Sequence, residues 1–129
     1  MKGNLLDTSA ALIALTDPSK LTPKVRKAIL AGPNLLSVIS WWEVMLKSMK
    51  GNLNVGDPRV WWSDALDQLA ATPLPLRPEH IAGIQELLQI HADPFDRVLI
   101  SQATVEGLAF VTTDTTVPLY ASAGFRVIA

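Results

Sequence analysis

Residues 4–15 read NLLDTSAALIAL and hold the first strand-to-helix unit that the sequence predicts. The segment NLLD (4–7) is predicted as a short apolar strand that ends in an acid. The segment SAALIAL (9–15) is predicted as a helix with Ser9 as its N-cap, because serine side chains accept hydrogen bonds from free backbone N–H groups. A strand that leads directly into a helix is typical of α/β folds.

The same unit recurs along the chain. Further apolar strands are expected at 34–39, 108–113 and 125–129, with a short extended piece at 72–76. Helices are expected at 22–32, 40–51, 59–71, 78–90 and 93–106, with a helical turn at 117–124. Short apolar strands that alternate with helices predict an α/β fold with a central parallel sheet covered on both faces. The length of 129 residues favours a single domain over residues 1–129.

The composition narrows the class of protein. A hydrophobic content of 49% is enough for a sizeable core, and a net charge of −1 gives no global basic signature for nucleic acid. The absence of cysteine excludes disulfides and thiolate metal sites. The first residues lack a long apolar segment, and no stretch approaches the roughly 20 apolar residues of a membrane span. We therefore expect a soluble cytoplasmic protein.

The segment HADPFDRVLISQA (91–103) places two acids at the start of an apolar helix. Asp93 is suited to the N-cap and Pro94 to the first helical position. Asp96 shares a helical face with Ile100 and Ala103, so that face is expected to be buried. A carboxylate that points toward a core is costly unless it is paired or coordinated. This spacing therefore predicts that Asp96 has a functional partner.

Four acids are expected at the carboxyl edge of the sheet, where the sites of open parallel sheets lie: Asp7, Glu43, Asp96 and Asp114. Clustered carboxylates repel one another unless a cation cancels their charge, and hard divalent cations suit sites made only of oxygen atoms. Two Mg²⁺ or Mn²⁺ ions would balance four carboxylates and support cleavage of a phosphodiester by a metal-activated water.

Other interpretations of these residues remain open. Glu43 also fits a capping box with Ser40, and a surface ion pair with Lys47 four residues later. No glycine-rich phosphate loop follows the first strand, and His80 and His91 have no spacing suited to zinc. His80 is expected to be solvated, and His91 to close the helix before it. The tryptophan pairs at 41–42 and 61–62 favour a core or dimer interface over base stacking.

Four segments in this order resemble the PIN domain family, and more narrowly the VapC toxins of bacterial type II toxin–antitoxin systems. They are LLDTSAALIAL, SVISWWEVMLKSMKGNL, HADPFDRVLISQA and FVTTD, which span nearly the whole chain. The resemblance implies a metal-dependent ribonuclease with a three-layer α/β/α sandwich. It places Asp7, Glu43, Asp96 and Asp114 as the metal-binding and catalytic acids. The segment TTDTTV departs from the family pattern, because it lacks the arginine or other charged residues that often flank the last acid.

The resemblance also implies partners and supporting residues. Ser9 and Thr112 match polar positions beside the first and last acids, and Asp93 matches an acid with a structural role. The expected cofactor is Mg²⁺ or Mn²⁺, and the expected partners are RNA, a VapB-type antitoxin and a second copy of the chain. Lys47 and Lys50 share a helical face with Glu43, so they lie either along an RNA phosphate path or in solvent. Arg97 is a further candidate for substrate binding.

The expected function is that of an endoribonuclease toxin. The alternative from another class is a PIN-like module that has lost catalysis and binds RNA or a protein partner. The presence of all four acids argues against that alternative. A DNA-directed or flap-type nuclease would share the same arrangement of acids.

Overall fold

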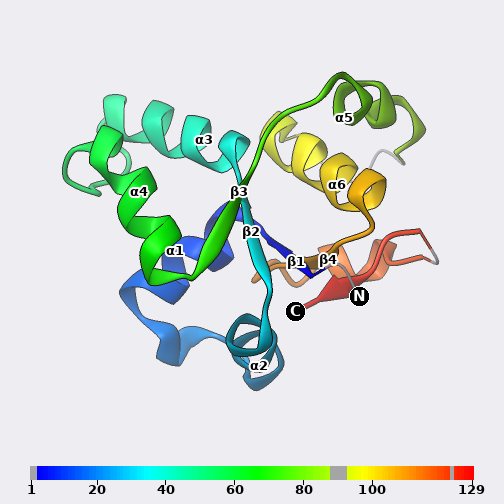
Figure 1. Ribbon diagram of the computed structural model, residues 1–129, viewed down its shortest axis with the longest axis horizontal. Helices are drawn as coiled ribbons and strands as arrows, with labels where there is room; N and C mark the ends of the chain where they lie inside the picture. The colour runs from blue at the N-terminus through cyan, green and yellow to red at the C-terminus, as the bar shows by residue number, and fades with distance from the viewer. Residues whose placement is uncertain (1–2, 88–92, 123) are drawn as a thin grey trace.

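The computed structural model describes residues 3–87, 93–122 and 124–129. Within these residues, five parallel strands form one sheet in the order β3-β2-β1-β4-β5 (Figure 1). The strands are β1 (Asn4–Leu6), β2 (Asn34–Ser37), β3 (Ala71–Leu74), β4 (Ala109–Val111) and β5 (Val127–Ile128). This arrangement confirms the predicted α/β fold with a central parallel sheet.

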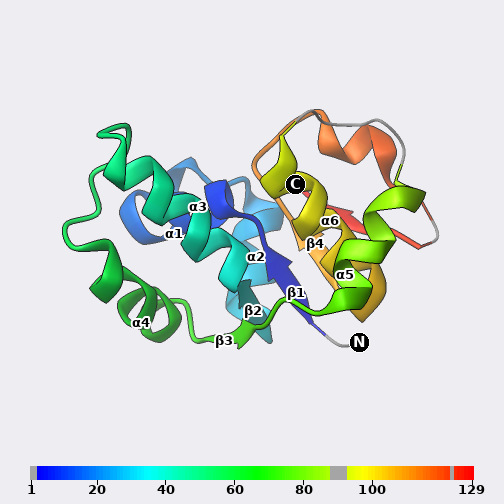
Figure 2. The same ribbon diagram turned by 90° about the horizontal axis from the view of Figure 1, so that it is seen from above.

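Helices cover both faces of the sheet. They are α1 (Thr8–Thr16), α2 (Pro23–Ala31), α3 (Val38–Met49), α4 (Pro58–Gln68), α5 (Pro78–Ala82) and α6 (Pro94–Glu106). Short 3₁₀ turns are found at Pro18–Lys20, Gly83–Glu86 and Val117–Tyr120. Figures 1 and 2 show α1 and α4 on one side of β1 and α5 and α6 on the other. None of the helices in the described ranges combines the length and apolar character needed to cross a membrane.

Two hydrophobic cores lie on opposite faces of the sheet, because successive side chains of a strand alternate. In β1, Leu6 packs into the core of α1 to α4, whereas Leu5 packs into the core formed with α6. Trp41 of α3 stacks on Trp62 of α4 with 5.2 Å between ring centroids, and Trp61 is buried beside them. The core interpretation therefore holds for three tryptophans, while Trp42 is 55% exposed.

Two helix starts differ from the sequence prediction. Asp7, not Ser9, caps α1, since its Oδ1 accepts a hydrogen bond from the Ala10 N–H at 2.7 Å. Ser37, not Ser40, caps α3 by accepting from the Ile39 N–H at 3.0 Å, so the predicted capping box of Ser40 and Glu43 is wrong. In both units no loop separates the strand from the helix. Asp7 directly follows β1 and Ser37 is the last residue of β2, and each of them is also the cap of the next helix.

The helix predicted at 78–90 is shorter than expected. The α-helical part ends at Ala82 and continues as the 3₁₀ turn Gly83–Glu86, whereas residues 88–90 lie outside the described residues. By contrast, α6 begins after its Asp93 cap as predicted, and Gly107 ends it with a positive φ of 68°. A glycine adopts this left-handed conformation without the strain that a Cβ atom causes.

His80 is fully buried, so the expectation that it is solvated was wrong. Its Nδ1 accepts a hydrogen bond from the Arg77 N–H at 2.9 Å, and its Nε2 lies 2.8 Å from Glu106 Oε2. These contacts assign the ring proton to Nε2, which donates to the carboxylate. The burial arises because α5 packs on α6, a contact that one sequence segment does not reveal. His91 lies outside the described residues.

We expect His80→Ala to lower the free energy of unfolding by about 2–4 kcal/mol, because it leaves a cavity and removes the hydrogen-bond partner of the Arg77 N–H and of Glu106. Chemical denaturation would measure the change. Ile81→Ala is the matched control on the same helix, since Ile81 is 50% exposed and its truncation should change stability by about 0.5 kcal/mol or less. Equal stability of the two variants would contradict a structural role for His80.

Candidate active site

The two central strands, β1 and β4, define the place where a site is expected. The chain proceeds outward from β1 to β2 and β3 on one side, and through β4 to β5 on the other. In open parallel sheets, ligands bind beyond the carboxyl ends of the strands at such a switch in order. Asp7 directly follows β1, and Thr112 directly follows β4. The fold therefore brings two sequence-predicted residues to one point.

Asp7 is buried at this point, with 6% of the residue exposed. Its Oδ2 accepts a hydrogen bond from Thr112 Oγ1 at 2.5 Å, in addition to the helix-capping bond of Oδ1. Burial raises the pKa of Asp7 to about 6, although the hydrogen bonds from Thr112 and Ala10 lower it. The charges of Glu43 and Asp114 raise it further, so both of these acids lie within electrostatic reach of Asp7.

Glu43 extends from α3 and is 4% exposed. Its Oε2 accepts a hydrogen bond from Lys47 Nζ at 2.6 Å, which confirms the predicted i, i+4 pair. The pair is not a surface pair, however, because the Glu43 side chain is only 5% exposed. The other carboxylate oxygen, Oε1, is buried and has no hydrogen-bond partner among the described residues. A buried charged oxygen without a partner is costly, so this atom is the clearest sign of a missing ligand.

A turn after β4 holds Asp114. Thr112, which is fully buried, accepts a hydrogen bond from the Asp114 N–H at 3.0 Å while its hydroxyl donates to Asp7. Asp114 Oδ1 in turn accepts from the N–H and the hydroxyl of Thr116, at 2.8 and 2.7 Å. Thr112 thus orients the acids at the ends of both central strands.

Asp96 lies in the first turn of α6 and is half-buried, whereas Ile100 and Ala103 on the same face are buried. The expected buried face therefore begins one turn after Asp96. Asp93 caps the helix, since its Oδ1 accepts from the Phe95 N–H at 2.8 Å and from the Asp96 N–H at 3.4 Å. This geometry confirms the predicted capping role of Asp93.

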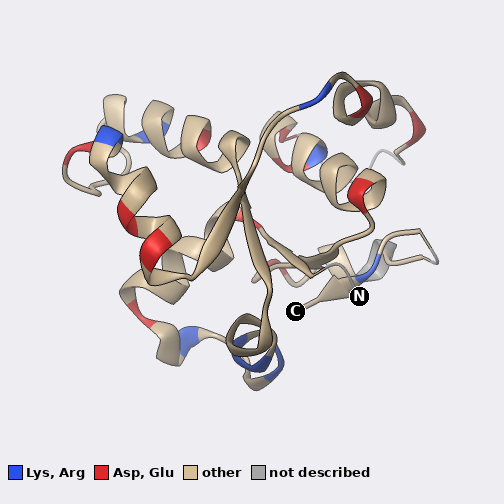
Figure 3. Cartoon of the chain, in the orientation of Figure 1, with Lys and Arg blue, Asp and Glu red and all other residues tan. Residues whose placement is uncertain are grey.

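Lys47 interacts with acids of both α3 and α6: it donates a hydrogen bond to Glu43, and the charge of Asp96 acts on it. Its pKa is raised, first by the hydrogen bond to Glu43 and then by the charges of Glu43, Asp93 and Asp96, although partial burial lowers it. The Lys47 ammonium therefore contacts Glu43 of α3 and is within reach of the charges at the start of α6. Figure 3 shows acidic segments on both of these helices, whereas basic segments gather on α2.

The acids supply the oxygen ligands that Mg²⁺ and Mn²⁺ prefer. Among the described residues, no group of three His, Asp or Glu side chains already stands close enough to hold a metal ion. Two observations nevertheless fit a cation: the unpartnered Glu43 Oε1 and the raised pKa of Asp7. A positive charge beside them would stabilise the ionised carboxylates of both Glu43 and Asp7. The residues present therefore fit a divalent cation after side-chain rearrangement.

The model of the PIN domain family matches residues 5–122. The chain belongs to the PIN domain family. No curated protein matches the sequence. Three solved structures share the fold of this PIN domain at low sequence identity. A chain of VapBC2 from Rickettsia felis, bound to a DNA fragment from its promoter, has a TM-score of 0.70 at 12% identity, with 98% of each chain covered.

Two further structures of VapBC proteins also share the fold. DNA-bound VapBC from Salmonella typhimurium has a TM-score of 0.67 at 16% identity, covering 98% of this chain and 97% of the other. VapBC-5 from Mycobacterium tuberculosis has a TM-score of 0.60 at 19% identity, covering 97% and 96%. At these identities the likeness establishes the three-layer fold of the PIN domain.

The remaining candidate residues differ in how far they are exposed to solvent. Ser9 is exposed on α1, and Lys50 is exposed at the end of α3. Arg97 is half-buried on α6. Sequence reasoning missed Thr8, which is buried and donates a hydrogen bond to Ser40 Oγ at 2.9 Å. Thr8 could have been found from its position directly after Asp7. Once Asp7 is known to cap α1, Thr8 falls in the first turn of that helix, where it meets Ser40 of α3.

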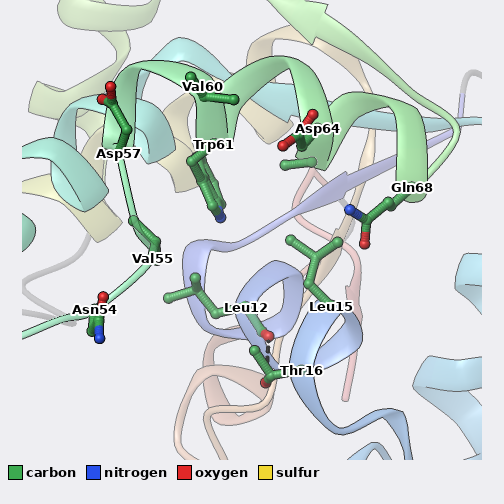
Figure 4. A pocket seen from close by; sticks show the side chains of 11 residues that line it. Leu12, Leu15, Thr16, Asn54, Val55, Asp57, Val60, Trp61, Asp64 and Gln68 are labelled. Atoms are coloured by element: carbon green, nitrogen blue, oxygen red, sulfur yellow. Dashed lines mark hydrogen bonds between the residues drawn. The ribbon is translucent and has the colours of Figure 1, made fainter.

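A separate groove of about 460 Å³ lies between α1 and α4 of the PIN domain. Figure 4 shows Leu12 and Leu15 on one wall and Val60 and Trp61 on the other. None of the four acids contributes to its lining, so this groove is a surface distinct from the acidic site.

We expect the metal-free PIN domain to lose stability as the pH rises from about 4 to 6. The pKa of Asp7 is about 6 in the folded protein, against the ordinary value of 3.8 for an aspartate, so the folded state retains a proton that the unfolded chain releases. Asp7→Asn keeps an oxygen for the Ala10 N–H but carries no charge. Without metal at pH 7.5, this variant should be more stable than the wild type by about 1–3 kcal/mol.

Urea unfolding in the presence of a chelator would measure this difference, which should shrink as the pH falls to 4. Asp67→Asn, a change at an exposed acid of α4, is the control and should follow the wild type. A wild type that is more stable than Asp7→Asn at pH 7.5 would contradict the desolvation of Asp7.

Proposed function

We propose that this PIN domain is a VapC-type toxin, a metal-dependent endoribonuclease. The observation that carries the proposal is the buried Glu43 carboxylate, which has an oxygen without a partner among the described residues and acts electrostatically on Asp7, the residue at the switch point between β1 and β4. Membership of the PIN domain family and the likeness of its fold to chains of VapBC complexes support the same assignment.

Asp7, Glu43, Asp96 and Asp114 are the proposed ligands of Mg²⁺ or Mn²⁺. The bound cation would activate a water for attack on the RNA phosphodiester and stabilise the charge that develops on the phosphate. Thr112 orients Asp7 by its hydrogen bond, and the Asp93 cap fixes the first turn of α6 that carries Asp96. The number of ions is also part of the proposal. Four carboxylates carry a charge of about −4, which two divalent cations would balance.

A binding module that has lost catalysis is the alternative from another class. The buried oxygen of Glu43, which has no partner among the described residues, disfavours it. Burying a charged oxygen without a partner destabilises the fold, and only a bound ligand would offset that destabilisation. Thermal stabilisation by Mg²⁺ or Mn²⁺ separates the two functions, since a degenerate module should show little. Matched RNA and DNA substrates separate a ribonuclease from a DNA-directed or flap-type enzyme.

A VapB-type antitoxin is the proposed protein partner, as the names of the matched VapBC complexes suggest. The groove between α1 and α4 offers an apolar floor to such a chain, with Asp57 and Asp64 among its lining residues. We propose that the antitoxin tail covers this groove and places an arginine or lysine at the acids. An arginine would suit them because its planar guanidinium binds carboxylates in a bidentate manner and stays charged.

A two-fold dimer and direct RNA contacts complete the proposal. Trp42, which is 55% exposed and packs edge-on against Phe95 with 5.0 Å between ring centroids, offers an exposed aromatic surface to a partner beside Glu43.

Lys50 and Arg97 are the proposed phosphate contacts. A toxin with these partners would act in the cytoplasm, where its RNA substrate lies.

We expect Asp7→Asn and Asp96→Asn each to lower metal-dependent RNA cleavage by at least about 100-fold while the fold survives, because each removes a charged ligand. Single-turnover cleavage of a labelled RNA in Mn²⁺, with circular dichroism of each variant, would measure both effects. Asp67→Asn should cleave at the wild-type rate, and a chelator should abolish cleavage by the wild type. Normal turnover of Asp96→Asn in saturating metal would exclude Asp96 from the site.

We also expect the antitoxin and the metal to compete for the acids. Saturating Mg²⁺ should weaken antitoxin binding by a factor in the range of about 5 to 150, which is typical of coupled ligands. Asp96→Asn should weaken antitoxin binding as well, and calorimetric titration would measure both effects. An antitoxin affinity that is unaffected by metal and by Asp96→Asn would show that the tail inhibits from elsewhere.

A further inference from the structure

Lys47 brings a positive charge into the acidic cluster from the same helix as Glu43. Its Nζ lies 2.6 Å from Glu43 Oε2, at the i, i+4 spacing and in the order that favours an ion pair on a helix. The two ends of this pair differ in exposure: the Lys47 side chain is 49% exposed, whereas the Glu43 side chain is 5% exposed. The carboxylate is therefore fixed in the site, and the ammonium reaches it from the solvent side.

Only half of the Glu43 carboxylate is satisfied by this contact. Oε2 has Lys47 as its partner, while Oε1 is buried without a hydrogen bond among the described residues. One ammonium therefore does not complete the site. The charges of Asp93 and Asp96, at the start of α6, also act on Lys47.

We infer that Lys47 is the resident counter-ion of the acidic site, and that a divalent cation must displace it from Glu43 in order to bind. The inference rests on the proposed function, because it concerns the metal site proposed there. Lys47 can leave because its half-exposed side chain can turn into water without exposing apolar surface, whereas Glu43 has no such route. The exchange is thus between two cations at a fixed carboxylate, and Lys47 lowers the affinity of the site for metal.

Lys47 is a positioning residue in this proposal, not a catalytic one. In the metal-free protein it offsets the repulsion between Asp7 and Glu43. It also keeps the Glu43 carboxylate in place until a divalent cation arrives. Among the described residues no three acids are arranged around a metal, so in the metal-free protein Lys47 is the cation that Glu43 contacts.

Calorimetric titration with Mn²⁺ tests the inference without relying on activity. Lys47→Met removes the charge and keeps the length of the side chain, and Lys47→Gln is a second uncharged variant in case the first fails to fold. Both should bind Mn²⁺ about tenfold more tightly than the wild type, because a competing and repelling charge has gone. Lys27→Met, which removes an exposed lysine of α2, should bind as the wild type does.

The outcomes separate this inference from the proposed function. If the wild type binds Mn²⁺ and both Lys47 variants bind it equally or more weakly, Lys47 is not a competitor and the inference is overturned while the proposed function stands. If the Lys47 variants bind Mn²⁺ and the wild type does not, the inference is supported. If none of the proteins binds Mn²⁺, the proposed metal site and the inference are both overturned.

A second measurement uses the wild type alone. An amine-acylating reagent should modify Lys47 slowly while Glu43 holds its ammonium, and saturating Mn²⁺ should raise this rate severalfold as the ammonium is released. Mass spectrometry would follow the rate at each lysine, with Lys24 and Lys50 as internal controls that should not change. An unchanged rate at Lys47 under saturating Mn²⁺ would overturn the displacement.

Discussion

The hydrogen bond from Thr112 to Asp7 joins the ends of the two central strands, and the arrangement of the site depends on it. The same Asp7 side chain caps α1, so one carboxylate ties together the end of β1, the start of α1 and the residue after β4. Thr112 then accepts from the Asp114 N–H, which extends the chain of contacts to the last acid. A displacement of any of these elements would therefore move the others.

The burial of charge is the second constraint on the site. Asp7 is desolvated enough to raise its pKa to about 6, and Glu43 is almost wholly removed from solvent. Isolated ionised carboxylates in such surroundings would be costly, so each has polar partners. Thr112 and a backbone N–H serve Asp7, while Lys47 serves one oxygen of Glu43. The remaining oxygen of Glu43 has no hydrogen-bond partner in the part of the chain that the structure describes.

A buried polar network sets the distance between α3 and α6, which carry Glu43 and Asp96. Ser37, the cap of α3, donates to Gln102 Oε1 of α6 at 2.5 Å, and Gln102 Nε2 donates to the Pro75 carbonyl at 3.3 Å. Ser101 of α6 donates to the His80 carbonyl at 2.5 Å, which fastens α5 as well. Because these groups are buried, breaking one contact leaves an unsatisfied polar atom, and the network resists movement of the two helices.

The sequence by itself determined the fold class, the approximate helices and strands, and the four acids as candidates, because apolar periodicity and helix caps are local properties. The caps of α2 and α6 by Thr22 and Asp93 were predictable in this way. The caps of α1 and α3 were not, since Asp7 and Ser37 are also the residues at the strand ends, and only strand pairing decides where a strand ends.

Tertiary structure alone decided the burial of particular side chains and the contacts between distant segments. His80 is buried because α5 packs on α6, and Thr8 meets Ser40 across 32 residues of sequence. Likewise, the sequence predicted the pair of Glu43 and Lys47 from its helical spacing, but not that one end is buried and the other half-exposed. Exposure depends on what packs over a residue, and that is set by elements remote in the chain, whereas an i, i+4 contact is set by the helix alone.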